Sequence, residues 1–162
     1  MKKRVLFLLI LTLSILSGSA QDFASRFLRT CGEDSTLTCI SISPKMMDEV
    51  LKSKDDNEDV EKMMNIISDL KSMQILTSKK NSQIHFEKAK RMLEKNTNRY
   101  IPFASYREGT ENCQISIRKK GETIIELVML QKKEDRFRII NFTGNMDQDF
   151  IHRLIDAMNP KS

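Results

Sequence analysis

Histidine and cysteine, the residue types that most often bind metals or act as nucleophiles, are scarce in this sequence and widely separated. The two histidines, His85 and His152, both fall on expected helices, and each is far in sequence from any cysteine. A two-histidine metal site would also need carboxylates that converge on it in space, and the sequence does not indicate any. Cys31, Cys39 and Cys113 lack the paired spacing of a zinc site. We therefore expect no metal and no cofactor.

Nucleophilic catalysis finds equally little support. The sequence contains no Gly-x-Ser-x-Gly turn, and no catalytic signature surrounds the cysteines. A pair of carboxylates could hydrolyse a substrate, but nothing distinguishes two of the 22 acidic residues from the others. We expect a protein that is not an enzyme and has no catalytic residues.

Methionine offers a candidate binding surface. The pairs Met46-Met47 and Met63-Met64 fall on neighbouring expected helices. Because methionine is flexible and polarizable, these side chains could line an apolar groove that adapts to varied ligands. The alternative is ordinary core filling in a chain that has no tryptophan.

Two short patterns concern glycosylation. The tripeptide from Asp34 to Thr36 is similar to an O-glycosylation acceptor known from some Gram-negative bacteria, which makes Ser35 a candidate for modification, although such tripeptides often arise by chance. The segment from Asn141 to Thr143 matches the N-glycosylation pattern, but its asparagine lies in an expected apolar strand. We discount the second pattern.

The first 20 residues have the features of a secretory signal peptide. Three basic residues precede an apolar run from Val5 to about Leu16, and small residues end at Ala20. The run is shorter than the ~20 residues that span a bilayer, so we expect export and cleavage near Ala20, and no stable membrane anchor. The next residue is Gln21 rather than a cysteine, which argues against a lipid anchor at that position.

Residues 21–162 are expected to form a single domain. Its 142 residues suffice for one core, and removing the three basic residues of the leader lowers the net charge from +5 to +2. A nearly balanced charge gives no reason to expect nucleic-acid binding.

In an oxidising compartment the three cysteines allow at most one internal disulfide. Cys39 and Cys113 lie in alternating apolar runs, which favours two buried thiols over a bridge.

Hydrophobic periodicity changes from helical to extended along the chain. The first half predicts a helical lead at residues 22–29 and a strand at 35–43. Two helices follow at 44–51 and 59–70, then a strand at 72–78 and a helix at about 84–96. Ser43 and Pro44 suit the start of the first long helix. An apolar stripe along the second ends at Leu70. The helix at about 84–96 is expected to bury Phe86, Ala89 and Leu93. Its other sides carry the basic residues Lys88, Lys90, Arg91 and Lys95. These are either solvated or placed to meet anionic lipid or an acidic partner.

The second half predicts consecutive strands and a closing helix. Residues 101–108 lead into a strand whose Cys113, Ile115 and Ile117 face one way. The next segment, TIIELVMLQ, is largely apolar on both faces and should lie in the middle of a sheet. After FRIINF, Gly144 is expected to end the last strand, and Asn145 or Asp147 to cap the final helix.

The segments ISISPKMMDEVL and GETIIELVMLQKKEDRFRIINFTGNMD, with the leader and the short final helix, resemble family 4252 of the domains of unknown function, small exported proteins of Gram-negative bacteria. The resemblance spans nearly the whole chain after the leader. It implies a location in the periplasm or cell envelope and a role near envelope regulation. No catalytic motif is associated with this family, so the resemblance assigns no functional residue.

These observations predict one α+β domain, with an antiparallel sheet of about five strands and helices packed on it. We expect a non-enzymatic envelope module that binds a protein partner. The alternative is a carrier of a small apolar or lipid-like ligand in a methionine-lined cavity. A carrier needs an internal apolar void, whereas an interaction module needs an exposed apolar patch or a free sheet edge.

Overall fold

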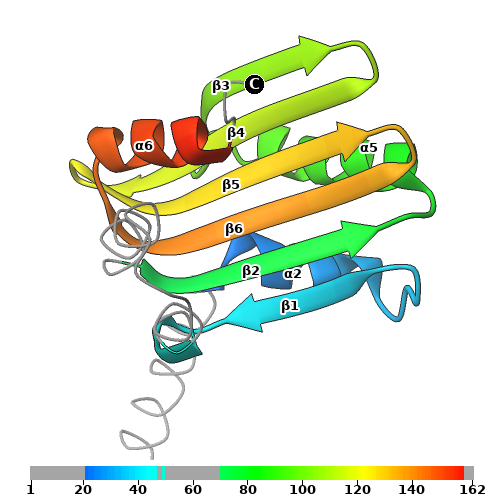
Figure 1. The fold of residues 1–162 in the computed structure, drawn as a ribbon, viewed down its shortest axis with the longest axis horizontal. Helices are drawn as coiled ribbons and strands as arrows, with labels where there is room; N and C mark the ends of the chain where they lie inside the picture. The colour runs from blue at the N-terminus through cyan, green and yellow to red at the C-terminus, as the bar shows by residue number, and fades with distance from the viewer. Residues whose placement is uncertain (1–20, 47–48, 50–69, 159–162) are drawn as a thin grey trace, which may run out of the picture.

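A twisted antiparallel sheet organises the protein (Figure 1). The computed structural model describes residues 21–46, 49 and 70–158. The strands are β1 (Thr38–Ile42), β2 (Leu70–Ser78), β3 (Ile101–Glu108), β4 (Glu111–Lys120), β5 (Thr123–Lys133) and β6 (Arg136–Met146). They are ordered β1-β2-β6-β5-β4-β3, and every neighbouring pair is antiparallel. The predicted α+β class is confirmed, with six strands where about five were expected.

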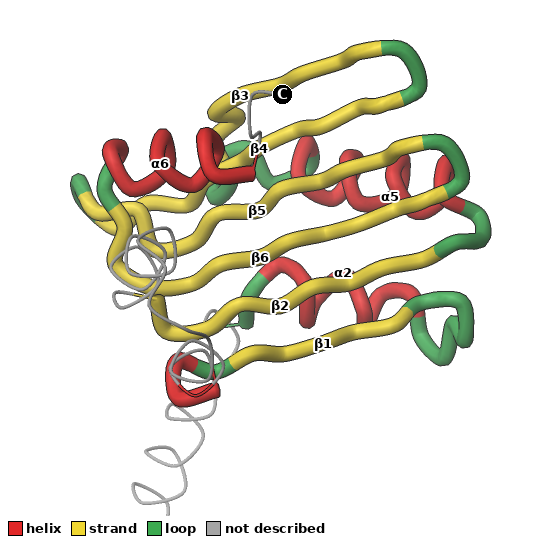
Figure 2. Tube along the Cα trace, in the orientation of Figure 1, coloured by secondary structure: helices red, strands yellow, loops and turns green. Residues whose placement is uncertain are grey.

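Helices cover both faces of this sheet (Figure 2). Helices α2 (Phe23–Cys31) and α5 (Ser82–Glu94) lie on one face, and α6 (Gln148–Met158) lies on the other. Residues 44–46 are also helical, and the Ser43 hydroxyl accepts a hydrogen bond from the Met46 N–H at 3.3 Å, as predicted for a helix cap. None of the helices in the described ranges is long and apolar enough to span a membrane.

Two hydrophobic cores result, one on each side of the sheet. Strand β5 contributes to both, because its successive side chains point to opposite faces, and the predicted central position of this segment is confirmed. The core beneath α6 includes Leu127, Met129, Ile140, Phe142, Phe150 and Ile151. The core beneath α2 and α5 includes Phe23, Phe27, Phe86, Val128, Leu130 and Phe137.

The termini of two helices follow from local sequence. Helix α5 begins two residues before the predicted start, after Asn81, which has a left-handed backbone with φ of 54°. Its inward residues, Phe86, Ala89 and Leu93, are buried as predicted. At α6, Asp147 is the cap, since its Oδ1 accepts a hydrogen bond from the Phe150 N–H at 2.6 Å.

Two boundary predictions are wrong. The helical periodicity predicts Leu70 at the end of a helical stripe, but it is the first residue of β2, where it pairs with Gly144 and is buried beneath α6. Gly144 does not end β6, which continues to Met146. A register shift between Ile124 and Glu126 lets β6 remain paired with β5 beyond the glycine.

Candidate functional site

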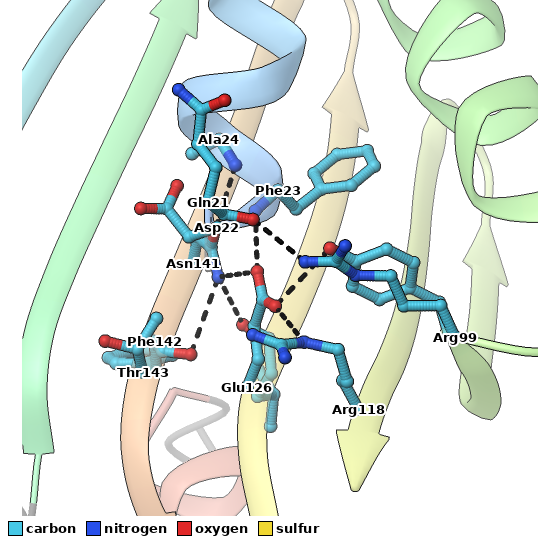
Figure 3. A network of polar contacts seen from close by, with 12 residues as sticks. Gln21, Asp22, Phe23, Ala24, Arg99, Arg118, Glu126, Asn141, Phe142 and Thr143 are labelled. Atoms are coloured by element: carbon cyan, nitrogen blue, oxygen red, sulfur yellow. Dashed lines mark hydrogen bonds and ion pairs between the residues drawn. The ribbon is translucent and has the colours of Figure 1, made fainter. Parts of the chain in front are cut away.

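Glu126 places a carboxylate in the middle of the apolar strand β5 (Figure 3). Its side chain is fully buried on the face covered by α2. Oε1 accepts hydrogen bonds from the Phe23 backbone N–H at 2.6 Å and from Asn141 Nδ2 at 3.2 Å. Oε2 accepts from Arg118 Nε at 2.6 Å and from the Tyr100 hydroxyl at 3.4 Å. Partners of this kind are what make a buried carboxylate tolerable, because an unpaired buried charge is very costly.

The same network fixes the first turn of α2 to the sheet. An α-helix leaves its first amides without partners inside the helix. Here the Phe23 N–H is bound by Glu126, and the Ala24 N–H donates to Asn141 Oδ1 of β6 at 2.8 Å. Asp22 caps the helix locally by accepting from the Ser25 N–H at 2.8 Å. Two strands that are far away in sequence therefore hold the beginning of α2.

Arg99 and Tyr100, which follow α5, complete this cluster. Arg99 Nη2 donates a hydrogen bond to the Gln21 carbonyl at 2.9 Å, and its guanidinium lies 5.5 Å from the centre of the Tyr100 ring. Burial raises the pKa of Tyr100, and the negative charge of Glu126 raises it further. The phenol therefore stays protonated at neutral pH and remains a hydrogen-bond donor.

This arrangement is suited to holding the chain rather than to reacting. The Glu126 side chain has no exposed surface, and both of its oxygens accept hydrogen bonds from protein donors. A catalytic carboxylate must come within hydrogen-bond reach of its substrate. We interpret Glu126 and Asn141 as the anchor that fastens residues 21–24 to the sheet.

His85 forms a smaller polar cluster at the edge of the same core. Its Nε2 lies 3.2 Å from the Thr36 hydroxyl and 3.6 Å from Asp34 Oδ2. Hydrogen bonds from Thr36 lower the pKa of Asp34, and the proximity of His85 and Lys88 contributes to a smaller extent. His152 is exposed on α6, on the opposite face of the sheet, so the two histidines cannot share a metal ion. Within the described ranges, no group of three or more histidine, cysteine or acidic residues is placed to hold one.

Only one of the four methionines of the predicted groove, Met46, is among the described residues. Met46 is half exposed, whereas Met47, Met63 and Met64 lie outside the described residues. The groove therefore stays a prediction. Ser35, the candidate for glycosylation, is exposed in a turn before β1, where a modifying enzyme could reach it.

The three cysteines are free thiols in different environments. Cys113 is buried as predicted, and burial raises its pKa to about 11. Cys31 is partly buried, and burial raises its pKa as well. The prediction that Cys39 is buried is wrong, because β1 is the outermost strand and no helix of the described chain covers this position.

One edge of the sheet, β3, is protected against pairing with another chain. Pro102 cannot donate to a neighbouring strand, and the register shifts between Pro102 and Ala104. Arg107 and Glu108 add charges near the end of the strand. Proline, bulges and charges are the features by which natural proteins keep sheet edges from recruiting other strands.

The opposite edge, β1, has none of these protective features. Its sequence, TCISI, contains no charge and no proline, and its pairing with β2 is continuous. Ile40 is 52% exposed, and its neighbours Ile42 and Ile75 are only partly buried. No described strand pairs with the outer side of β1. This strand therefore offers backbone hydrogen-bonding groups beside an apolar strip, and we take it as the candidate interaction site.

The sequence contains a signal for each of the two buried anchor residues, Glu126 and Asn141, which were not predicted as functional residues. Glu126 is the one charged residue within the largely apolar segment TIIELVMLQ, a pattern that indicates a buried ion pair. Asn141 is likewise a polar residue within an expected apolar strand. The partners of these two side chains come from β4, α2 and the segment after α5, which sequence spacing does not bring together.

Comparison with protein families identifies the chain. The model of the family described as Domain of unknown function (DUF4252) matches residues 31–154, so the chain belongs to that family. The matched range contains all six strands, including β1, Glu126 and Asn141. No curated protein matches the sequence.

Proposed function

We propose that this member of the DUF4252 family is an exported, non-enzymatic module of the cell envelope that binds a protein partner through the outer edge of β1. Such binding would serve a sensing or regulatory system. Export is supported by the composition of the first 20 residues. It is also supported by the anchoring of Gln21, Phe23 and Ala24 directly after the expected cleavage site.

The observation that carries this proposal is the contrast between the two edge strands. β3 combines a proline, an irregular register and charges, whereas β1 is regular, uncharged and exposed. Extended peptides bind such edges by adding a strand, with backbone hydrogen bonds providing affinity and alternate side chains providing specificity. The strip of Ile40, Ile42 and Ile75 would accept apolar side chains of the added strand.

The absence of enzymatic activity is part of the proposal. Both carboxylate oxygens of Glu126 and the Nε2 atom of His85 have protein partners, and Glu126 is inaccessible to a substrate. The alternative function, carriage of an apolar ligand, depends on methionines that lie mainly outside the described residues. The hollow of about 430 Å³ between α5 and the β3–β4 hairpin opens to the surface and includes charged side chains, which does not suit a lipid carrier.

Site-specific photocrosslinking tests this function. A photoreactive amino acid at position 40 should give one discrete adduct in intact cells, and the same amino acid at position 101 of β3 should give none. Ile40 and Ile101 are a matched pair, because both are exposed isoleucines on edge strands. The captured protein, once purified, should bind the native protein and lose affinity for Ile40→Lys but not for Ile101→Lys. Equal affinity for both variants would refute binding at β1.

A further inference from the structure

The outer side of α5 carries a stripe of residues that the hydrophobic core does not use. Ile84, Lys88, Arg91 and Lys95 follow one another at spacings of four, three and four residues, so they align along one side of the helix. At 1.5 Å per residue the stripe is about 16 Å long. This basic stripe lies on a different element from the β1 edge and requires its own explanation.

The positive charges of the basic stripe are largely uncompensated. Lys88 Nζ donates a hydrogen bond to the Thr30 carbonyl at 3.0 Å, and its charge helps to lower the pKa of Asp34, so Lys88 is partly compensated. Arg91 and Lys95 form no ion pair within the part of the chain that the structure describes. Glu87 lies beside the stripe, and its carboxylate accepts a hydrogen bond from Gln83. The stripe therefore retains an excess of positive charge.

An apolar surface accompanies these charges. Ile84 is 66% exposed, more than any other large hydrophobic residue described here. Together with Met92 it lines a shallow hollow of about 480 Å³, which the side chains of Lys88, Arg91 and Lys95 also border. Lysine and arginine can lay their aliphatic stems along an apolar surface while their charged ends reach outward. The surface thus combines an apolar floor with cationic tips.

We propose that the basic stripe of α5 docks the protein on an anionic phospholipid surface. Lipid phosphates would meet the cationic tips, and Ile84 would enter the region between the headgroups. A purely acidic peptide would satisfy the charges but would offer no apolar region for Ile84. Three cations and one apolar side chain give peripheral, salt-sensitive binding, because exposed charges are screened by salt. Such docking would keep the β1 edge close to partners in the envelope.

Vesicle sedimentation tests this proposal. The purified protein should bind vesicles of equal phosphatidylglycerol and phosphatidylcholine at low salt and should not bind pure phosphatidylcholine. Arg91→Gln with Lys95→Gln should weaken binding by about 30-fold, since each basic side chain near an anionic surface contributes about a fivefold factor. The control removes the same charge elsewhere, through Arg107→Gln with Lys120→Gln, and should bind as the native protein does. All four positions are exposed.

A second pair of variants tests the apolar part. Ile84→Ser should weaken vesicle binding by about fivefold, because only the 66% of the residue that is exposed can be newly buried in the membrane, whereas Ile101→Ser should leave it unchanged. Circular dichroism would confirm that each variant is folded. Equal losses for the two charge variants would overturn the proposal, because they would indicate a general charge effect. Binding to polyglutamate-coated beads without binding to vesicles would also overturn it and would assign the stripe to an acidic protein.

Discussion

Replacing Glu126 with leucine should destabilise the fold strongly. Leucine still fills the space in β5 but removes the acceptor of the Phe23 N–H and the partner of Arg118. Removing one member of a buried ion pair costs about 3–5 kcal/mol. The Arg118 side chain is 19% exposed and can be partly hydrated, so the lower end of that range, about 3 kcal/mol, applies. The buried Phe23 N–H, which loses its acceptor, adds about 1 kcal/mol to this cost. We therefore expect a loss of about 4 kcal/mol in the free energy of unfolding.

Urea denaturation followed by circular dichroism measures this loss. The matched control is Glu111→Gln, which breaks the surface pair between Glu111 and Lys133 at 3.2 Å and should cost less than about 1 kcal/mol. Adding Arg118→Leu to Glu126→Leu should recover at least about 1 kcal/mol relative to the sum of the single changes, because no charge is then left unpaired. If Glu126→Leu and Glu111→Gln cost the same, the anchoring role assigned to Glu126 is wrong.

Three further predictions concern a helix cap and the thiols. Asp147→Ala should lower the free energy of unfolding by about 1 kcal/mol by removing the cap of α6, and a change below about 0.3 kcal/mol in urea denaturation would contradict this. Alkylation of the native protein, followed by mass spectrometry, should label exposed Cys39 first and Cys113 last; early labelling of Cys113 would contradict its burial. Stability should also fall as pH rises from about 9 towards about 11, because the Cys113 thiol ionises in the unfolded chain before it ionises in the folded one. A Cys113→Val variant should show a shallower decline over this range, and an unchanged slope would refute the assignment.

The parts of the fold that depend on local periodicity could be predicted from the sequence. Alternation in β4 correctly placed Cys113, Ile115 and Ile117 on one buried face. The helical stripe of α5 was also correct, and Asp147 is one of the two caps predicted for α6, because both features depend on residues within a few positions of one another.

Features that depend on strand order could not be predicted in the same way. Cys39 lies in an alternating strand that resembles a buried one, and only its position at the edge of the sheet exposes it. The neighbours of Glu126 come from segments 8 to 103 residues away. Sequence spacing shows that a buried acid needs partners but does not identify them.

Hydrogen exchange of the β1 amides in a complex with the crosslinked partner is the most direct test of binding at this edge. We expect amides within Thr38–Ile42 to exchange more slowly in the complex, while those of Ile101–Glu108 are unchanged. Unchanged exchange throughout β1, with protection appearing on another surface, would contradict binding at the β1 edge.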